Sequence, residues 1–394
     1  MKQEKYGWVV VAAAFTLMFV GFGAAYSFAA FFTAFETEFG ASRGHIALVF
    51  SLAALTWFLS GAPGGVLADR FGPRRVALAG VACLAAALAL ASVAGSVTML
   101  YTTYSIGIGL GVGLVYVPAV GAVQPWFGAN RAFASGLAVA GIGAGNIAGP
   151  LLAAGWIAQF GWRGACLALS ASILVVGGAA AFAIRQRPGT QRQSAGGSGV
   201  RTAMKTPAFW LLYASLILSC VGTFVPMVHL GPFAQDAGLS AAQGVTLVSL
   251  IGLGSLLGRF TIGPFADRLG RQASLAAMYG GLGAMLLVWL AAQSYWLLAL
   301  FAVVFGVCYG GYVALLPTLV MDRYGARSVS GIIGFLYTGA GLGTLLGPWL
   351  AGVAYDALGA YDLPIVAGAA CAFLAAACIL VLMQNEKTPA RHSR

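Results

Sequence analysis

The chain has 394 residues, of which 60% are hydrophobic and 8% are charged, and its formal net charge is +11. A typical soluble domain has about 25% charged residues, and a chain this apolar would lack the polar surface to face water as a soluble globule. The composition excludes soluble enzymes, nucleic-acid-binding proteins and disordered chains, and it indicates a protein that crosses a membrane several times.

Apolar stretches long enough to cross a bilayer, which takes about 20 residues of helix, follow one another along the chain. In the first half they lie near residues 7–32, 44–67, 75–95, 98–123, 132–156 and 164–184. In the second half they lie near residues 208–232, 243–266, 272–292, 295–320, 329–353 and 363–383. We therefore expect an all-α membrane protein with 12 transmembrane helices in two six-helix bundles.

These spans divide the chain into four parts. We expect an N-terminal bundle, a cytoplasmic linker, a C-terminal bundle and a cytoplasmic tail over residues 1–184, 185–207, 208–384 and 385–394. Pro, Gly, Ser and basic residues predict a flexible linker rather than regular structure between the bundles. The first span begins close to Met1 without a small-residue cleavage site at a signal peptide's distance, so we expect it to be retained.

The positions of the cations predict the orientation in the membrane. With both termini inside, 18 of the 21 Lys and Arg residues fall on the inner side, Arg43 and Arg163 fall outside, and Arg259 falls within a span. Such an excess of inner cations is typical of cytoplasmic loops, and these loops face acidic membrane lipid. We expect a multi-pass protein of the cell inner membrane with cytoplasmic N- and C-termini.

One motif occurs twice, in the loops that follow the second and the eighth spans. Its first copy contains Gly65, Asp69, Arg70, Gly72, Arg74 and Arg75, and its second copy contains Gly263, Asp267 and Arg268. The two aspartates are 198 positions apart, and a run of glycines after the fourth and tenth spans repeats in the same register. The chain is therefore predicted to be two halves in the same orientation, a parallel repeat typical of alternating-access transporters.

Each copy of this motif combines groups that suit a conformational switch. Glycine permits a tight turn, the aspartate is expected to accept backbone N–H bonds at a helix N-terminus, and the arginines face the inner leaflet. Charge pairs between the halves would then latch one conformation and break in the other. The alternative is a plain helix–turn–helix connection.

Taken together, these residues resemble a known family. The repeated loop resembles the marker motif of the major facilitator superfamily. Tyr6-Gly7-Trp8-Val9-Val10 and the stretch from Trp126 to Gly141 resemble the first-helix and fifth-helix motifs of monocarboxylate transporters, and Arg259 matches the arginine of their eighth helix. The bacterial oxalate:formate antiporters share these features. The resemblance implies a secondary transporter with the major facilitator fold.

Arg259 is the candidate anchor for the substrate. A cation at the bilayer centre costs about 2.5–3.5 kcal/mol on insertion scales, and a guanidinium presents a planar fork that matches a carboxylate. The alternative is a snorkelling arginine that pairs with Asp267. Because all ten Asp and Glu residues fall in loops, tails or helix ends, a cationic substrate would find no counter-ion, so an anion is favoured.

Two departures from the family leave the coupling ion open. Animal-type monocarboxylate transporters carry a lysine in helix 1 and an aspartate one turn before the helix-8 arginine, where this chain has Tyr26 and Ser255. Proton symport, exchange and uniport all remain open, with H⁺ as an optional second substrate. Histidine ordinarily titrates near neutrality, so His229 is a candidate for proton, gating or substrate contacts, with an ordinary hydrogen-bonded histidine as the alternative.

The number of buried cations bears on the substrate. Oxalate:formate antiporters have a second cation in helix 11, whereas the matching stretch here is Gly339-Ala340-Gly341. One cation suits a monoanion, although polar groups and dipoles can also stabilise a second charge. A small monocarboxylate is therefore favoured over an oxalate-like dicarboxylate.

Tyrosines on the predicted inner-facing helices are further candidates for substrate contacts. Tyr116, Tyr337 and Tyr26 are favoured, ahead of Tyr309 and Tyr312, because phenol hydroxyls at this depth require hydrogen-bond partners. The alternative is helix packing or an interfacial aromatic belt. For the lone polar residues Asn146, Gln124 and Ser255, helix–helix hydrogen bonds are the favoured interpretation, although Ser255 stays among the candidate substrate contacts.

The sequence as a whole predicts a monomeric transporter of lactate-, pyruvate- or acetate-like anions that works by alternating access. The alternatives are an oxalate:formate-type exchanger and a transporter-fold receptor that binds without translocating. No catalytic constellation indicates an enzyme. Six isolated cysteines suggest neither a metal site nor disulfides, and no cofactor is expected.

Overall fold

The structure is a computed structural model that describes residues 2–127, 131–187, 198–292, 294–325 and 329–387. The N-terminal half contains α1 (Lys2–Tyr26), α2 (Phe28–Phe39), α3 (Arg43–Phe71), α4 (Pro73–Ala91), α5 (Val97–Leu100), the π-helical η1 (Tyr101–Ile106), α6 (Gly107–Val123), the 3₁₀ turn η2 (Gln124–Trp126), α7 (Arg131–Ser172), the π-helical η3 (Ile173–Gly177) and α8 (Gly178–Ala183). Residues 188–197 of the predicted linker and 388–394 of the predicted tail lie outside the described residues.

The C-terminal half has longer uninterrupted helices. It contains α10 (Pro207–Asp236), α11 (Ala241–Leu269), α12 (Arg271–Ala291), α13 (Tyr295–Tyr324), α14 (Val329–Leu358) and α15 (Asp362–Lys387). Hydroxyl side chains begin several of these helices: Thr206 accepts a hydrogen bond from the amide of Phe209, and Ser240 forms a capping box with Gln243. Such caps satisfy amides that have no partner within the helix.

The described residues form the predicted number of membrane spans. Eleven described helical segments are long and apolar enough to cross a membrane, and one of them, Phe133–Ala183, has 51 residues. Gly161 interrupts that segment with a left-handed φ of 68°, and its repeat counterpart Gly359, with φ 71°, separates α14 from α15. The long segment is therefore two spans, and the described part of the chain has twelve.

The internal repeat reappears in the backbone with the register found in the sequence. The bounds of α3 and α11 differ by 198 positions at both ends. Gly72 and Gly270, which follow these helices, have φ of 89° and 84°, a region that is open to glycine but strained for other residues. The repeated motif therefore produces the same turn in both halves.

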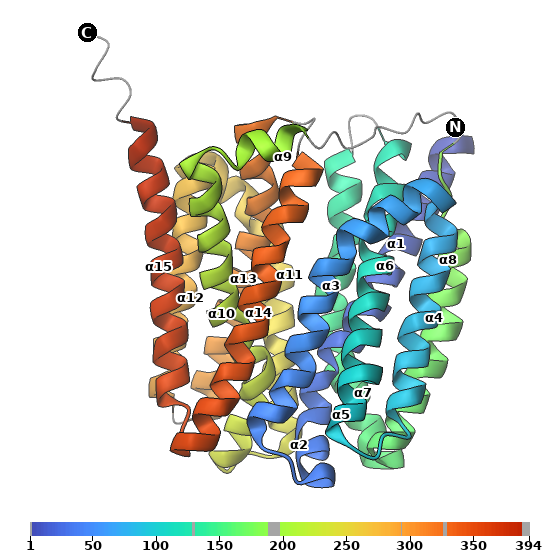
Figure 1. Cartoon of the computed structure of the whole chain (residues 1–394), viewed down its shortest axis with the longest axis vertical. Coiled ribbons are helices and arrows are strands. Elements are labelled where there is room, and N and C mark those ends of the chain that lie inside the picture. The colour runs from blue at the N-terminus through green and yellow to red at the C-terminus, as the bar shows by residue number, and fades with distance from the viewer. Residues whose placement is uncertain (1, 128–130, 188–197, 293, 326–328, 388–394) are drawn as a thin grey trace.

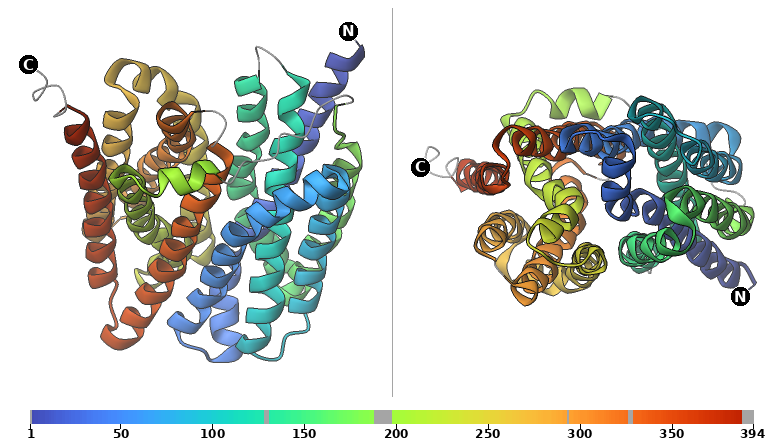
Figure 2. Two further views of the ribbon diagram at one scale, coloured as in Figure 1. Left: turned by 45° about the horizontal axis from the view of Figure 1, so that its top comes forward. Right: turned by 90° about the horizontal axis from the view of Figure 1, so that it is seen from below.

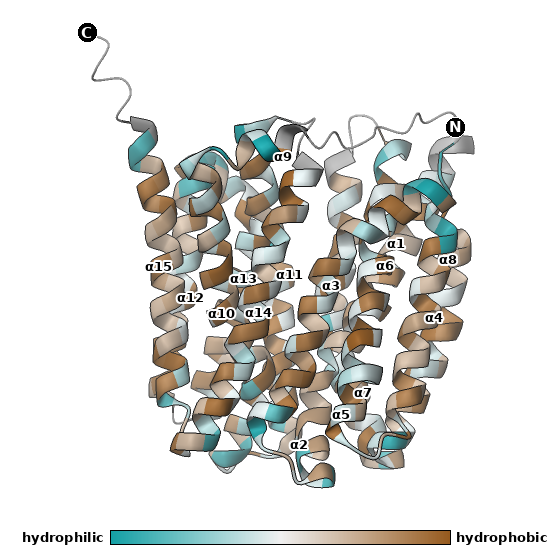
Figure 3. Cartoon of the chain, viewed as in Figure 1, coloured by the Kyte–Doolittle hydropathy of each residue, from teal (hydrophilic) through white to brown (hydrophobic). Residues whose placement is uncertain are grey.

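The two halves lie side by side, and the start of α1 and the end of α15 lie at the same end of the bundle (Figures 1 and 2). The halves meet where α3 packs against α14 and α7 against α11. The middle of the bundle is apolar and the hydrophilic residues gather at its two ends (Figure 3), as expected for helices that lie in a bilayer. We call the end where α1 begins and α15 ends the termini end, and the opposite end the far end.

Two expectations from the sequence are wrong. The last turns of α3 and α11 include residues 65–71 and 263–269, which the sequence predicted as loop. Asp69 therefore lies at the C-terminal end of a helix and not at an N-terminus. The linker is not entirely irregular, because Ser198–Ala203 forms the short helix α9. Apolar contact explains that helix, since Val200 packs against Gly331 at the start of α14.

Candidate functional site

Arg259 lies at the interface between the two halves. It projects from α11, and its Nη1 donates a hydrogen bond of 3.1 Å to the carbonyl oxygen of Val139 on α7. Its Nε is buried and has no hydrogen-bond partner among the described residues. An unsatisfied buried donor of a charged group is costly, so this nitrogen is available to an incoming acceptor.

The hydroxyls of four tyrosines lie within electrostatic range of this cation. The charge of Arg259 acts electrostatically on the hydroxyls of Tyr26, Tyr116, Tyr309 and Tyr337. The hydroxyls of Tyr26 and Tyr309 are 3.0 Å apart, and those of Tyr116 and Tyr337 interact with each other. Each pair joins one residue of the N-terminal half to one of the C-terminal half, so the cluster spans the interface.

Two small polar side chains lie on the helices that meet at Arg259. Ser255, one turn before Arg259 on α11, is 1% exposed, and Asn146 on α7 is also 1% exposed. The Oγ of Ser255 and the Oδ1 of Asn146 have no hydrogen-bond partner among the described residues. Close packing holds α11 in place, because a Cβ added at Gly310 of α13 would lie 2.0 Å from the carbonyl oxygen of Ser255.

His229 belongs to a different cluster from Arg259. It is fully buried in α10, with its Nε2 2.8 Å from the carbonyl oxygen of Pro348 and its Nδ1 3.1 Å from the hydroxyl of Tyr361. The carbonyl can only accept, so Nε2 carries the proton and Nδ1 accepts from Tyr361. Both ring nitrogens of a neutral histidine are thus satisfied.

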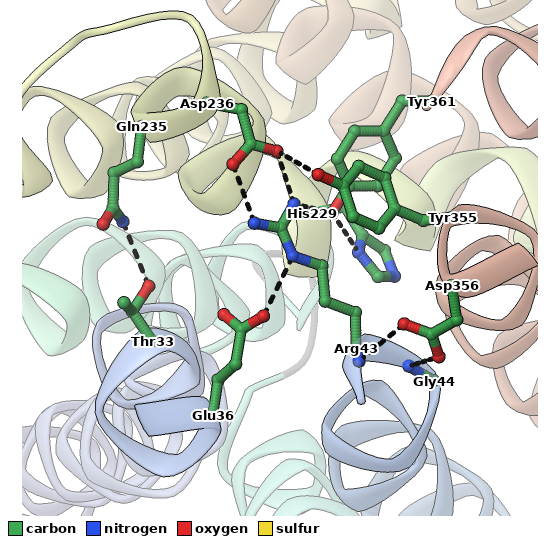
Figure 4. A network of polar contacts seen from close by, with 10 residues as sticks. All are labelled: Thr33, Glu36, Arg43, Gly44, His229, Gln235, Asp236, Tyr355, Asp356 and Tyr361. Carbon is green, nitrogen blue, oxygen red and sulfur yellow. Dashed lines mark hydrogen bonds and ion pairs between the residues drawn. The ribbon is translucent and has the colours of Figure 1, made fainter. Parts of the chain in front are cut away.

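Arg43 is the centre of a polar network at the far end, drawn in Figure 4. Its guanidinium makes two hydrogen bonds to Asp236, of 2.5 and 2.8 Å, and its Nε lies 3.1 Å from Glu36 Oε1. Nη1 also donates to the hydroxyl of Tyr361 at 3.0 Å. We call this group, with Tyr355, Asp356 and His229, the Arg43 network.

The Arg43 network joins the two halves of the molecule. Arg43 is in the N-terminal half, whereas Asp236, Tyr355 and Tyr361 belong to the C-terminal half (Figure 4). Tyr355 donates to Asp236 at 3.0 Å, and its ring lies 4.1 Å from the guanidinium carbon of Arg43. Burial raises the pKa of Tyr361, so its hydroxyl stays protonated. This hydroxyl donates a hydrogen bond to Nδ1 of His229 and so joins His229 to Arg43.

Asp356 adds a backbone contact to the same interface. Its two carboxylate oxygens accept from the amides of Arg43 and Gly44, each at 2.9 Å. These amides begin α3, whose own N-cap residue, Ser42, makes no side-chain cap. A carboxylate of α14 therefore caps a helix of the other half, where negative charge is stabilising.

The motif residues lie at the termini end. Asp69, Arg70 and Arg75 are exposed on the first copy, and Gly263, Asp267 and Arg268 are exposed on the second. Gly65 packs against the side chain of Val117, and the guanidinium of Arg74 lies 4.7 Å from the ring of Phe182. The Arg74 contact lies within one half.

The structure changes the weight of two residues that the sequence ranked lower. The Oδ1 of Asn146 has no hydrogen-bond partner among the described residues, and Tyr309 pairs with Tyr26. The Arg43 network was missed altogether. Its only sequence signal was that Arg43 is one of two cations expected outside, close to acids at helix ends.

Comparisons with known proteins agree with this architecture. The family model described as Major Facilitator Superfamily matches residues 13–282 and 217–394. Monocarboxylate transporter 3 of Rattus norvegicus is 30% identical over 379 residues, which cover 91% of this chain and 76% of that protein. Monocarboxylate transporter 2 of Homo sapiens is 27% identical over 397 residues, covering 90% and 81%.

Solved structures share the fold at lower sequence identity. A bacterial homologue of the human lysosomal transporter Spinster, in an inward-facing and unoccupied conformation, superposes with a TM-score of 0.76 at 17% identity, covering 96% of this chain and 97% of that one. A peptide transporter in complex with sulfate also gives a TM-score of 0.76, at 14% identity, covering 95% and 94%.

Proposed function

Because this chain belongs to the Major Facilitator Superfamily and is related to monocarboxylate transporters, we propose that it is a secondary transporter of small monocarboxylates in the cell inner membrane. It works as a monomer with both termini in the cytoplasm. Lactate-, pyruvate- and acetate-like anions are its substrates, and no cofactor takes part.

The observation that carries this proposal is the unpaired Nε of Arg259. Nη1 of the guanidinium already donates to the carbonyl of Val139, and Nε has no hydrogen-bond partner among the described residues, so Nε can donate to a carboxylate. Charge-assisted bonds of this kind are about twice as strong as neutral ones. Tyr26 and Tyr309, whose hydroxyls meet beside the cation, would exchange their mutual hydrogen bond for bonds to the substrate.

The packing of α14 supports a substrate with one negative charge. A Cβ added at Gly339 would lie 2.9 Å from the ring of Tyr213, and one added at Gly341 would lie 3.2 Å from the side chains of Leu55 and Phe58. A long cationic side chain would not fit at either glycine without displacing these groups. A single guanidinium then balances a single carboxylate.

The Arg43 network supports alternating access with the far end closed. It bonds the two halves at one end of the bundle, while the carboxylates of Asp69 and Asp267 are exposed at the other end. With cytoplasmic termini, this arrangement corresponds to a state closed toward the outside. The halves would then rock about Arg259 and release the Arg43 network when the outside opens.

Uptake of labelled L-lactate into proteoliposomes tests the proposal, with the native protein compared with Arg259→Gln. We expect the native protein to accumulate label and the variant to take up no more than empty liposomes. Equal uptake by both proteins would refute the role of Arg259. Uptake that follows an imposed inward proton gradient would indicate symport, and uptake that ignores the gradient would indicate uniport or exchange.

The runner-up function is an oxalate:formate-type exchanger. It predicts that native proteoliposomes ignore lactate and take up labelled oxalate only when they are loaded with formate. The absence of a cation at Gly339 and Gly341 disfavours this activity, because a dianion would carry an unbalanced charge into the bundle.

A further inference from the structure

The backbones of α3 and α14 touch at the far end of the interface between the two halves. Gly44, in the first turn of α3, and Gly352 of α14 are both buried. A Cβ added at Gly352 would lie 2.7 Å from the Cα of Gly44 and 2.8 Å from its amide nitrogen. A Cβ added at Gly44 would lie 2.9 Å from Oδ2 of Asp356 and 3.1 Å from the amide nitrogen of Val353. Backbone atoms cannot move aside as a flexible side chain can, so a side chain at Gly352 would force the two helices apart.

The polar bonds across the same seam require this close approach. Asp356, one turn after Gly352, accepts hydrogen bonds of 2.9 Å from the amides of Arg43 and Gly44. Carbon atoms in van der Waals contact lie about 3.5–4.0 Å apart, so a methyl group at Gly352 requires a displacement of about 1 Å. Hydrogen bonds stretched by that amount pass the usual limit of about 3.2 Å. The glycine pair and the Asp356 cap therefore depend on one spacing.

The repeat supplies a comparison, because the seam between α7 and α11 is equivalent to the seam between α14 and α3. At the positions equivalent to Gly44 and Gly352, 198 residues away, it has Ala242 and Ala154. Ala242 is exposed and Ala154 is half-buried, whereas both glycines are buried. The two seams share one fold, but this pair of residues differs. The backbone contact at the far end therefore follows from the two glycines and not from the fold.

The contact between Gly44 and Gly352 crosses between the halves, unlike the contacts of two other glycines on α14. Cβ atoms added at Gly343 and Gly347 would each lie 2.3 Å from a carbonyl oxygen of α10. Those contacts hold together helices of the C-terminal half. Gly44 and Gly352 instead join helices of different halves, which have to separate when the far end opens.

Resting on the proposed alternating access, we infer that the contact between Gly44 and Gly352 determines how far the far end closes. A methyl group at either position costs free energy in the state in which α3 and α14 touch, whereas separated helices leave room for it. A substituent whose free energy differs between two states shifts their populations. A single methyl group at this contact therefore holds the far end open.

Spin labels at His45→Cys in the N-terminal half and Leu363→Cys in the C-terminal half test this inference, since both residues are exposed at the far end. In Gly352→Ala the ratio of the shorter to the longer distance population should fall by about 5- to 100-fold, the range expected for overpacking a tight contact. A distance distribution identical to that of the labelled native protein would overturn the inference.

Gly155→Ala is the matched control. Gly155 lies on α7 at the same end of the equivalent seam, next to Ala154, and nothing lies within 4 Å of a Cβ added there. This variant makes the same chemical change as Gly352→Ala and should keep the native distance distribution. A control that shifted the distances as far as Gly352→Ala would contradict the assignment to the glycine contact.

Gly44→Ala reaches the same contact from the other half, so it keeps the test decisive if Gly352→Ala does not fold. It should shift the distances in the same direction. In the double variant the population ratio should change by less than the product of the two single changes, because one methyl group has already separated the helices. A change equal to the full product would mean that the two glycines act independently, against the inference.

The two failures are distinguishable because the distance measurement does not depend on transport. Unchanged distances in Gly352→Ala and Gly44→Ala would overturn this inference and leave the role of Arg259 intact. Equal uptake of L-lactate by the native protein and by Arg259→Gln would overturn the proposed function and leave the contact between the glycines unaffected.

Discussion

Arg259 of α11 donates a hydrogen bond from Nη1 to the carbonyl oxygen of Val139 on α7, at 3.1 Å. The partly buried cation of one half is thus held by the backbone of the other half. Val139 occupies the repeat position of Tyr337, and Arg259 that of Gly61, 198 residues away in each case. The two halves share a fold, but the charge belongs to one of them.

Arg259→Lys should keep part of the transport that Arg259→Gln loses. A lysine retains the charge, but a point charge cannot bond Val139 and also grip a carboxylate through a planar fork. We expect the KM for L-lactate to rise by about tenfold or more, in line with the loss of one charge-assisted bond, and kcat to change less. Arg163→Gln, at an arginine paired with Glu38 within one half, should leave KM unchanged, and an Arg259→Lys protein with native KM would contradict the bidentate grip.

Asp236→Asn should shift the protein toward a state opened at the far end. The change removes the charge that Arg43 bonds twice, across the two halves, and bonds to charged groups contribute about 1.5–3 kcal/mol. Spin labels at His45→Cys and Leu363→Cys, both exposed at this end, should report a population at longer distance.

Glu38→Gln is the control for that experiment. It makes the same change of charge at the same end but breaks a pair that lies within the N-terminal half, Glu38 with Arg163. The distance distribution of this control should match the unsubstituted labelled protein. A distribution in Asp236→Asn that also stayed unchanged would mean that the Arg43 network does not hold the halves together.

His229→Gln should lower stability without removing any dependence of transport on a proton gradient. Both imidazole nitrogens are already bonded, to Pro348 and Tyr361, so a proton on Nδ1 would face a hydroxyl that is donating to it. We expect a loss of about 1–3 kcal/mol in stability, measured as a lower melting temperature in detergent. Loss of gradient-driven uptake with an unchanged melting temperature would instead assign the proton to His229.

Gly72→Ala and Gly270→Ala should destabilise the protein by similar amounts. Their φ values of 89° and 84° are strained for a residue with a Cβ, at a cost of about 1–3 kcal/mol each. Gly280→Ala, inside α12 with nothing within 4 Å of an added Cβ, should be neutral or stabilising by up to about 1 kcal/mol. The measurement is the melting temperature of each variant. A smaller decrease for Gly72→Ala and Gly270→Ala than for Gly280→Ala would contradict backbone strain at the two turns.

The helices and their repeat are predictable because their signals are local. A run of about 20 apolar residues has to become a helix in lipid, and the glycines of the two turns sit 198 positions apart in the sequence as in the backbone. Local signals also misplaced the ends of α3 and α11. Charged residues and glycine are typical of loops, but Asp69 and Asp267 lie within the last turns of their helices.

The site is less predictable because its partners are distant in sequence. Arg259 could be singled out because it is a cation in an apolar stretch. Its hydrogen-bond partner Val139 could not be predicted, because it is 120 residues away in the sequence. Arg43 and Asp236 are 193 residues apart. Asn146 looked like any polar residue between helices, and only the packing of α7 on α11 shows that its Oδ1 has no partner among the described residues.

The cap that Asp356 places on α3 has a consequence for how conformational change can be watched. When the halves separate at the far end, the amides of Arg43 and Gly44 lose their carboxylate and meet water, since Ser42 offers no side-chain cap in its place. Deuterium uptake at these two amides would therefore report the outward opening that the proposed alternating access requires. The first turn of α3 offers a label-free measure of that proposed movement.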